Sequence, residues 1–255
     1  MGNSLCVKNK IIGEGKPIVC VPIMEKSIDA IIAKASEMVA DEVEMIEWRV
    51  DAFEQADNLN AVREVLERLE PLVKNTILVY TFRSKNQGGL MSLTQEQIFD
   101  LHEIAVERKV ADFVDIELFE AKNAAREIYK LQEKGVHVIA SHHDFEETPS
   151  RDILDMILNK MRESGAAVVK LAVMPKNFSD VITLLDETNR FHTEYPNQPL
   201  VTMSMGSMGC ISRVAGEAFG SCITFGAFDK ASAPGQLPAD ELEQVLSILH
   251  KSMGE

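Results

Sequence analysis

The chain has 255 residues, of which 45% are hydrophobic and 26% are charged, which is the composition of an ordinary globular protein. Its formal net charge is −14, and this acidity argues against nucleic acid or an anionic membrane surface as a partner. No apolar stretch approaches the roughly 20 residues that cross a bilayer, and the N-terminal segment lacks the apolar core of a signal peptide. The four cysteines are widely spaced, so we expect reduced thiols in a cytoplasmic protein.

Short apolar segments alternate with longer amphipathic ones along the whole chain. Residues 5–13 come first, and their Asn9-Lys10 centre is typical of a hairpin. The sequence then predicts eight strands over residues 18–23, 45–50, 76–82, 113–118, 137–141, 167–173, 200–205 and 222–225. Between and after them it predicts helices over residues 28–39, 59–69, 94–109, 121–134, 150–164, 177–191, 210–219 and 238–252.

Eight strand–helix units in a chain of this length favour an α/β fold, namely a (β/α)8 TIM barrel in which residues 1–255 form a single domain. The N-terminal β-hairpin is expected to cap the bottom of the barrel. A doubly wound sheet is the competing architecture, but no G-x-G-x-x-G follows the first predicted strand.

Residues two positions apart recur at the ends of the predicted strands. The pairs are Glu47 and Arg49, Thr81 and Arg83, Asp115 and Glu117, Ser141 and His143, and Met203 and Met205. This spacing turns both side chains to one face of a strand, and active sites of such barrels lie at the C-terminal strand ends. We therefore expect these side chains to line one site. Ion pairing of the two arginines with Glu47 and Glu117 is the simpler interpretation, and the two are compatible.

Lys170 lies within an otherwise apolar run, residues 166–174, that is predicted to be a buried strand. Lysine is rarely buried unless it is paired, and a desolvated amine attacks a ketone or aldehyde to form a Schiff base. The alternative is a lysine whose head reaches water at the strand end. His143 shares the inward direction of Ser141 and is expected to act beside Lys170 as a general acid and base, while His142 points to the helix layer.

Three arginines are expected near the same end of the barrel, because Arg213 follows the seventh strand and joins Arg49 and Arg83. Clustered guanidinium groups suit a carboxylate or a phosphate.

Glycine-bearing loops at 206–209 and 226–236 follow strands seven and eight. The second is expected to close over a ligand, or else to be a plain connection. The first strand has no H-x-H pattern, which argues against a metal-dependent barrel hydrolase.

Taken together, these segments resemble one known family, type I 3-dehydroquinate dehydratase. The resemblance rests on residues 47–51, 81–84 with Gly88-Gly89, 141–145, 169–175, 202–205, 211–213 and 232–236. It implies a lyase of the shikimate pathway, which leads to chorismate and the aromatic amino acids. Such an enzyme dehydrates 3-dehydroquinate to 3-dehydroshikimate, needs no metal or cofactor, and works as a cytoplasmic homodimer.

The same resemblance implies the role of each residue. Lys170 forms the Schiff base with the ring ketone. His143 removes the C2 proton and later protonates the departing hydroxyl, so that water leaves by syn elimination. Arg213 holds the substrate carboxylate. Binding of hydroxyl groups or ordering of the pocket falls to Glu47, Arg49, Arg83, Ser232 and Gln236, and the apolar wall to Met203 and Met205.

Gln87 departs from the family pattern, in which a glutamate usually precedes the paired glycines. We expect Gln87 to orient His143 without supplying a negative charge, and therefore to weaken proton transfer.

Two rival functions remain open at this point. A class I aldolase acting on a phosphorylated sugar would share the buried lysine, and a non-catalytic barrel that binds a small anion would not need a nucleophilic Lys170.

Overall fold

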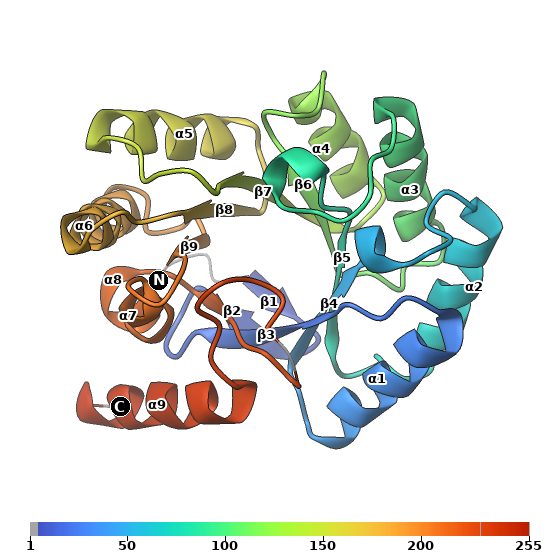
Figure 1. Ribbon diagram of the computed structural model, residues 1–255, viewed down its shortest axis with the longest axis horizontal. Helices are drawn as coiled ribbons and strands as arrows, with labels where there is room; N and C mark the ends of the chain where they lie inside the picture. Colours follow the sequence, from blue (N-terminus) through green and yellow to red (C-terminus); the bar gives the residue numbers. More distant parts are fainter. Residues whose placement is uncertain (1–4, 230, 255) are drawn as a thin grey trace.

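The computed structural model describes residues 5–229 and 231–254, and they form an α/β barrel (Figure 1). The strands of its sheet are parallel and lie in the order β10-β3-β4-β5-β6-β7-β8-β9. Their bounds are β3 Ile18–Ile23, β4 Met45–Arg49, β5 Ile77–Thr81, β6 Phe113–Glu117, β7 His137–Asp144, β8 Val168–Val173, β9 Leu200–Ser204 and β10 Ile223–Phe225. The predicted fold class is confirmed.

The sheet nearly closes on itself between β9 and β10. A single bridge joins Leu200 to Ser221, and the backbone N–H of Cys222 donates to the carbonyl of Leu200 at 2.8 Å. Closure brings the C-terminal ends of all eight strands to one rim. Side chains from segments far apart in the sequence therefore face a common centre.

Helices follow the strands and surround the sheet (Figure 1). They are α1 Ile28–Ala40, α2 Leu59–Leu69, α3 Gln95–Glu107, α4 Ala124–Glu133, α5 Arg151–Glu163, α6 Phe178–Glu194, α7 Cys210–Val214, α8 Gly216–Phe219 and α9 Ala239–Ser252, with the short 3₁₀ helices η1 Val50–Ala52 and η2 Lys85–Gln87. Helix α3 begins with a capping box between Thr94 and Gln97. Gly135 and Gly165 follow α4 and α5 with positive φ, as their predicted role at helix ends requires. In the described ranges, no helix is long and apolar enough to cross a membrane.

One predicted helix was wrong. Residues 210–219 form two short helices, α7 and α8, that meet at Ala215. Gly216 packs so closely on the chain before β10 that a Cβ there would lie 2.6 Å from the carbonyl oxygen of Ser221 and 2.9 Å from Pro17. This close packing sets the direction of α8. Strand β7, in turn, runs three residues beyond its predicted end at Ser141, because pairing with β8 continues to Asp144 and Val173.

The predicted N-terminal hairpin is confirmed and consists of β1 Leu5–Val7 and β2 Lys10–Ile12. Its turn is Lys8-Asn9, one residue earlier than predicted, and both turn residues have positive φ. Val7 and Ile12 are buried in the cluster that fills the lower barrel, so the hairpin caps the bottom. The other members of this cluster include Ile18, Cys20, Met45, Ile77, Phe113, Ile139 and Val168. The barrel interior is thus apolar at the bottom, and the polar strand ends lie above it.

Candidate active site

Thr81, Asp115, Glu117 and Ser141 of the strand-end pairs do not line the cavity of about 250 Å³ at the C-terminal end of the barrel, but eleven other predicted site residues do. They are Glu47, Arg49, Arg83, Gln87, His143, Lys170, Met203, Met205, Arg213, Ser232 and Gln236. Gly88, Phe145, Ala172, Phe225, Ala233 and Pro234 complete the lining. Most of these positions lie at strand ends or in the loops that follow them, so barrel closure alone brings them together.

Lys170 is buried, with 4% of its surface exposed, although it carries an amine. Its Nζ lies 3.4 Å from Oδ2 of Asp115 and 3.7 Å from Oε1 of Glu47. The ring of Phe225 covers it at 4.4 Å from the ring centroid. Glu47 in turn accepts a hydrogen bond from Oγ1 of Thr81 at 2.9 Å. The expected alternative, a lysine head that reaches water at the strand end, does not hold, because the Lys170 head is buried in the wall that lines the cavity.

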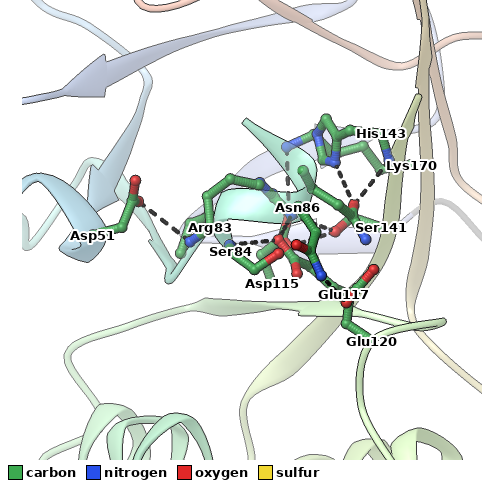
Figure 2. A network of polar contacts seen from close by, with 12 residues as sticks. Asp51, Arg83, Ser84, Asn86, Asp115, Glu117, Glu120, Ser141, His143 and Lys170 are labelled. Carbon is green, nitrogen blue, oxygen red and sulfur yellow. Dashed lines mark hydrogen bonds and ion pairs between the residues drawn. The ribbon is translucent and has the colours of Figure 1, made fainter. Parts of the chain in front are cut away.

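Arg83 holds the carboxylates beneath Lys170 (Figure 2). Its Nη2 lies 2.9 Å from Oδ2 of Asp115, and its Nη1 donates to Oε1 of Glu117 at 2.9 Å and to Oγ of Ser141 at 3.0 Å. Burial alone would raise the pKa of Asp115, but the charges of Arg83 and Lys170 outweigh it and lower that pKa to about 2. Asp115 is therefore an anion at neutral pH.

Arg49 forms its ion pair with Asp51. Nε and Nη2 of Arg49 each lie 2.8 Å from a carboxylate oxygen of Asp51. The expected pairing of the two arginines with Glu47 and Glu117 is therefore confirmed only for Arg83, which pairs with Glu117. Asp51 comes two residues after Arg49. The chain turns into η1 there, and this turn brings the Asp51 carboxylate to the Arg49 guanidinium. The same carboxylate accepts the backbone N–H groups of Arg83 at 3.2 Å and Leu90 at 3.0 Å. Asp51 thereby anchors both ends of the segment that carries η2.

His143 contacts Gln87 through two atoms. Its backbone N–H donates to Oε1 of Gln87 at 2.9 Å, and its Nδ1 lies 3.0 Å from the same oxygen. Because a carbonyl oxygen only accepts, Nδ1 carries the hydrogen, and Nε2 keeps its lone pair. Burial, followed by the charges of Arg83, Lys170 and Arg49, holds the pKa of His143 well below its usual value. The imidazole is therefore neutral at pH 7 and able to accept a proton at Nε2.

Arg213 has no carboxylate partner in the part of the chain that the structure describes. It is 1% exposed, and its terminal nitrogens donate to the carbonyl oxygens of Phe225 at 3.4 Å and Pro234 at 3.1 Å. Its Nε is buried without a partner among the same residues. Burial lowers the pKa of Arg213 to about 10. An unpaired, desolvated guanidinium in a cavity wall is prepared to receive an anion.

The loop over residues 226–236 lies across this cavity, and its residue 230 falls outside the described residues. Its Pro234 carbonyl accepts the N–H of Gly206 at 3.1 Å, which joins the two glycine-bearing loops. Gly235 approaches so closely that a Cβ would lie 2.2 Å from the Gly206 oxygen. Within the loop, Oε1 of Gln236 accepts the N–H of Ser232 at 2.7 Å. These contacts hold Ser232 and Gln236 at the cavity.

A protein-family model described as Type I 3-dehydroquinase matches residues 19–253. The chain belongs to this family. It is 41% identical to 3-dehydroquinate dehydratase of Bacillus subtilis over 251 residues, covering 98% of each chain, and 42% identical to that of Listeria innocua over 250 residues, covering 98% of this chain and 99% of the relative.

Solved structures place the chain in the same family. A crystal structure of type I 3-dehydroquinate dehydratase from Clostridium difficile, with covalently modified comenic acid, has a TM-score of 0.95 and 42% identity, over 99% of this chain and 100% of that one. The 3-dehydroquinate dehydratase of Geobacillus kaustophilus has a TM-score of 0.94 and 32% identity, over the whole of both chains. A keto-gulonate-phosphate decarboxylase from Vibrio cholerae, with a TM-score of 0.58 and 14% identity, shares only the barrel fold.

Two residues of this type I 3-dehydroquinase site, Asp51 and Phe225, escaped the sequence-based candidate set, and they bind or cover charged groups described above. Asp51 continues the spacing of two that marked Glu47 and Arg49, so that pattern was a usable signal for it. Asp115 was among the strand-end residues predicted to line the site, and it contacts Lys170 without lining the cavity itself. Of the two adjacent histidines, His142 packs its ring edge-on against Phe119, away from the cavity, as predicted. In the described ranges, no three His, Cys, Asp or Glu side chains are grouped to hold a metal ion.

Proposed function

We propose that the protein dehydrates 3-dehydroquinate to 3-dehydroshikimate in the shikimate pathway through a Schiff base on Lys170. One observation carries the proposal: a single cavity brings together a buried amine, a neutral imidazole and a guanidinium without an anion. These three groups match the three needs of the reaction, which are activation of the ketone, movement of a proton and recognition of the carboxylate.

In the first step, Lys170 loses a proton and attacks the ring ketone through its Nζ. In the carbinolamine that forms, the former ketone oxygen takes up one proton from the nitrogen and the proton that Lys170 lost. It then leaves as water, and a cationic iminium remains. Asp115 and Glu47, at 3.4 Å and 3.7 Å from Nζ, provide fixed negative charge beside that cation. Phe225 adds the face of its ring on the same group.

In the second step, the iminium draws electrons from the adjacent carbon and makes its C–H acidic. Nε2 of His143 takes this proton, because Nδ1 is occupied by its hydrogen bond to Gln87. The electron pair moves to form the new double bond, and the hydroxyl β to the original ketone leaves with the proton that His143 returns. Both groups are on one face, so elimination is syn. Water then hydrolyses the iminium, which releases the product and frees Lys170.

Gln87 sets the limit on this proton transfer. Its carbonyl oxygen orients His143, but an amide adds no negative charge next to the imidazolium that forms transiently. Arg83, Lys170 and Arg49 already place positive charge around that ring. We therefore assign the proton abstraction, rather than imine formation, as the slow chemical step.

Arg213 anchors the substrate carboxylate, since it has no carboxylate partner while the other two cavity arginines are already paired. Arg49 and Arg83 therefore act by ordering the pocket. Ser232 and Gln236, on the loop across the cavity, bind substrate hydroxyl groups. The apolar wall formed by Met203 and Met205 faces the carbon skeleton of the ring.

The test is to incubate the protein with 3-dehydroquinate and record the rise in ultraviolet absorbance from the conjugated product. Lys170→Ala is expected to abolish the rise, and the exposed-surface variant Lys122→Ala is expected to keep it. If the ultraviolet absorbance does not rise with the unmodified protein, the proposal is wrong. Turnover of a phosphorylated sugar instead would favour an aldolase, and binding of the substrate without turnover would favour a non-catalytic barrel.

We also propose that the protein is a homodimer in the cytoplasm, as the family resemblance implies. Phe178 and Ile182 lie one helical turn apart on α6, with 68% and 65% of their surfaces exposed. Two large apolar side chains on one helix face are of the kind that a contact between copies covers. Sedimentation equilibrium is expected to give twice the mass of the chain, and a monomer at all concentrations would contradict this part.

A further inference from the structure

A second cavity of about 150 Å³ lies beside β6 and shares no lining residue with the active-site cavity. It is bounded by β6, by helices α3 and α4, and by the segment 82–93 that carries η2 (Figure 1). Neither the lysine nor the catalytic histidine takes part in its lining. The reaction proposed above gives no role to this cavity.

His102 is a buried residue in the wall of this cavity, and one of its ring nitrogens lacks a partner among the described residues. It is 3% exposed, and its Nδ1 lies 2.5 Å from Oε1 of Glu127 on the neighbouring helix. A carboxylate accepts hydrogen bonds, so Nδ1 carries the hydrogen, and in the neutral form of the ring Nε2 then presents a lone pair. That Nε2 has no partner in residues 5–229 and 231–254. A buried acceptor of this kind calls for a ligand that donates a hydrogen bond.

Ser84 offers a second polar atom to the same cavity. Its backbone N–H donates to Oε1 of Glu117 at 2.9 Å (Figure 2), while its Oγ is buried without a partner among the described residues. Ser84 also lines the cavity. A ligand nitrogen placed between the imidazole and this hydroxyl would satisfy both atoms at once.

The charges around the cavity favour a cation. Glu117 is neutralised by Arg83, but Glu120 accepts only the neutral amide of Asn86 at 3.0 Å, and Glu127 faces only the imidazole. Two carboxylates therefore lack a positive partner there among the described residues. A bare metal ion is a poor match, since no three suitable donors are grouped in that part of the chain.

We propose that this cavity binds a small primary ammonium ion. One N–H donates to Nε2 of His102, a second donates to Oγ of Ser84, and the positive charge is balanced by Glu120 and Glu127. A primary ammonium supplies the two N–H donors and the positive charge that this arrangement requires, and a cavity of this size admits a short alkyl chain.

The experiment titrates the ¹⁵N-histidine-labelled protein with methylammonium chloride, and in parallel with tetramethylammonium chloride at equal ionic strength. Methylammonium is expected to move the His102 Nε2 resonance upfield in a saturable manner, while tetramethylammonium, which has no N–H, is expected to leave it in place. Backbone amide shifts of residues 91–93 in the cavity wall provide a second readout that does not need a histidine.

Variants separate the imidazole acceptor from general ionic effects. His102→Phe is expected to weaken methylammonium binding at least tenfold in the backbone readout, because one charge-assisted hydrogen bond is lost. His102→Gln, which keeps an acceptor oxygen, is expected to retain part of the affinity. His142→Phe is the matched control, since His142 also has a buried ring nitrogen without a partner in the described ranges but does not line the cavity.

Three results would each overturn the proposal. They are no saturable movement with methylammonium, which would mean that only water occupies the cavity, equal movement with tetramethylammonium, and undiminished binding by His102→Phe. None of these measurements depends on turnover, so they stand apart from the test of the dehydratase reaction.

Discussion

Replacing Arg213 by glutamine should weaken substrate binding strongly while leaving the fold intact. Burial lowers the pKa of Arg213 to about 10, roughly two to three pH units below a solvated guanidinium, so at about 1.4 kcal/mol per unit the unpaired charge costs about 3 kcal/mol. A bound carboxylate offsets that cost, and glutamine has no charge to offer it. Since about 1.4 kcal/mol is a factor of ten, we expect KM for 3-dehydroquinate to rise about a hundredfold, with a smaller change in kcat.

In the absence of substrate, replacing Arg213 by glutamine should leave the stability of the fold unchanged or raise it. The depressed pKa of Arg213 means that folding disfavours its charge, so the neutral Arg213→Gln variant should unfold at the same temperature as the parent protein or higher. Steady-state kinetics and thermal unfolding measure the two effects, with the exposed Arg126→Gln as a control for loss of a positive charge. A KM within about threefold of the parent value, or a clear loss of stability, would refute the role of Arg213 as carboxylate anchor.

Three further variants test the rest of the site. Gln87→Glu places an anion beside His143, so we expect the pKa of His143 to rise, the acidic limb of the kcat/KM profile to move to higher pH, and turnover to increase; an unchanged or lower rate would show that this position does not limit the reaction. The pKa of Asp115 is lowered to about 2, so its charge stabilises the fold above its unfolded pKa and this contribution is lost as pH falls through about 2. Asp115→Asn should therefore reduce the free energy of unfolding by about 2 to 3 kcal/mol at pH 7, and by less in acid, in denaturant titrations; equal stability at pH 7 would contradict the buried network. Gly235→Ala puts a Cβ 2.2 Å from a carbonyl oxygen at positive φ, and should raise KM through displacement of the loop over residues 226–236; unaltered kinetics would argue against a positioning role for that loop.

Much of the fold was predictable because the hydrophobic periodicity agrees with the glycine positions that end helices along the chain. The β-branched run that contains Lys170 gave its strand directly, and Gly135 and Gly165 marked helix ends through their left-handed backbone. The division of residues 210–219 was not predictable, since it depends on the close approach of Gly216 to Ser221, a contact made only in three dimensions. The length of β7 likewise depends on its partner strand.

The candidate site was also predictable only in part. The spacing of two at strand ends predicted Glu47 and His143, and the apolar run predicted Lys170; they line one cavity because barrel closure fixes where strand ends lie. Charge pairing was harder to predict. Arg49 pairs with Asp51 across the start of η1, and Arg213 is left unpaired, and neither outcome is visible in spacing. The distinction matters, because it separates the arginine that receives a carboxylate from the arginines that order the pocket.

Lys170 is proposed to form a covalent imine with the ketone of 3-dehydroquinate. The most direct measurement is intact mass spectrometry after borohydride reduction in the presence of the substrate. We expect a stable adduct of the mass of the substrate or product joined to one lysine, mapped to Lys170 by digestion and absent from Lys170→Ala. Unmodified mass for the active parent protein, or an adduct that persists in Lys170→Ala, would contradict the account.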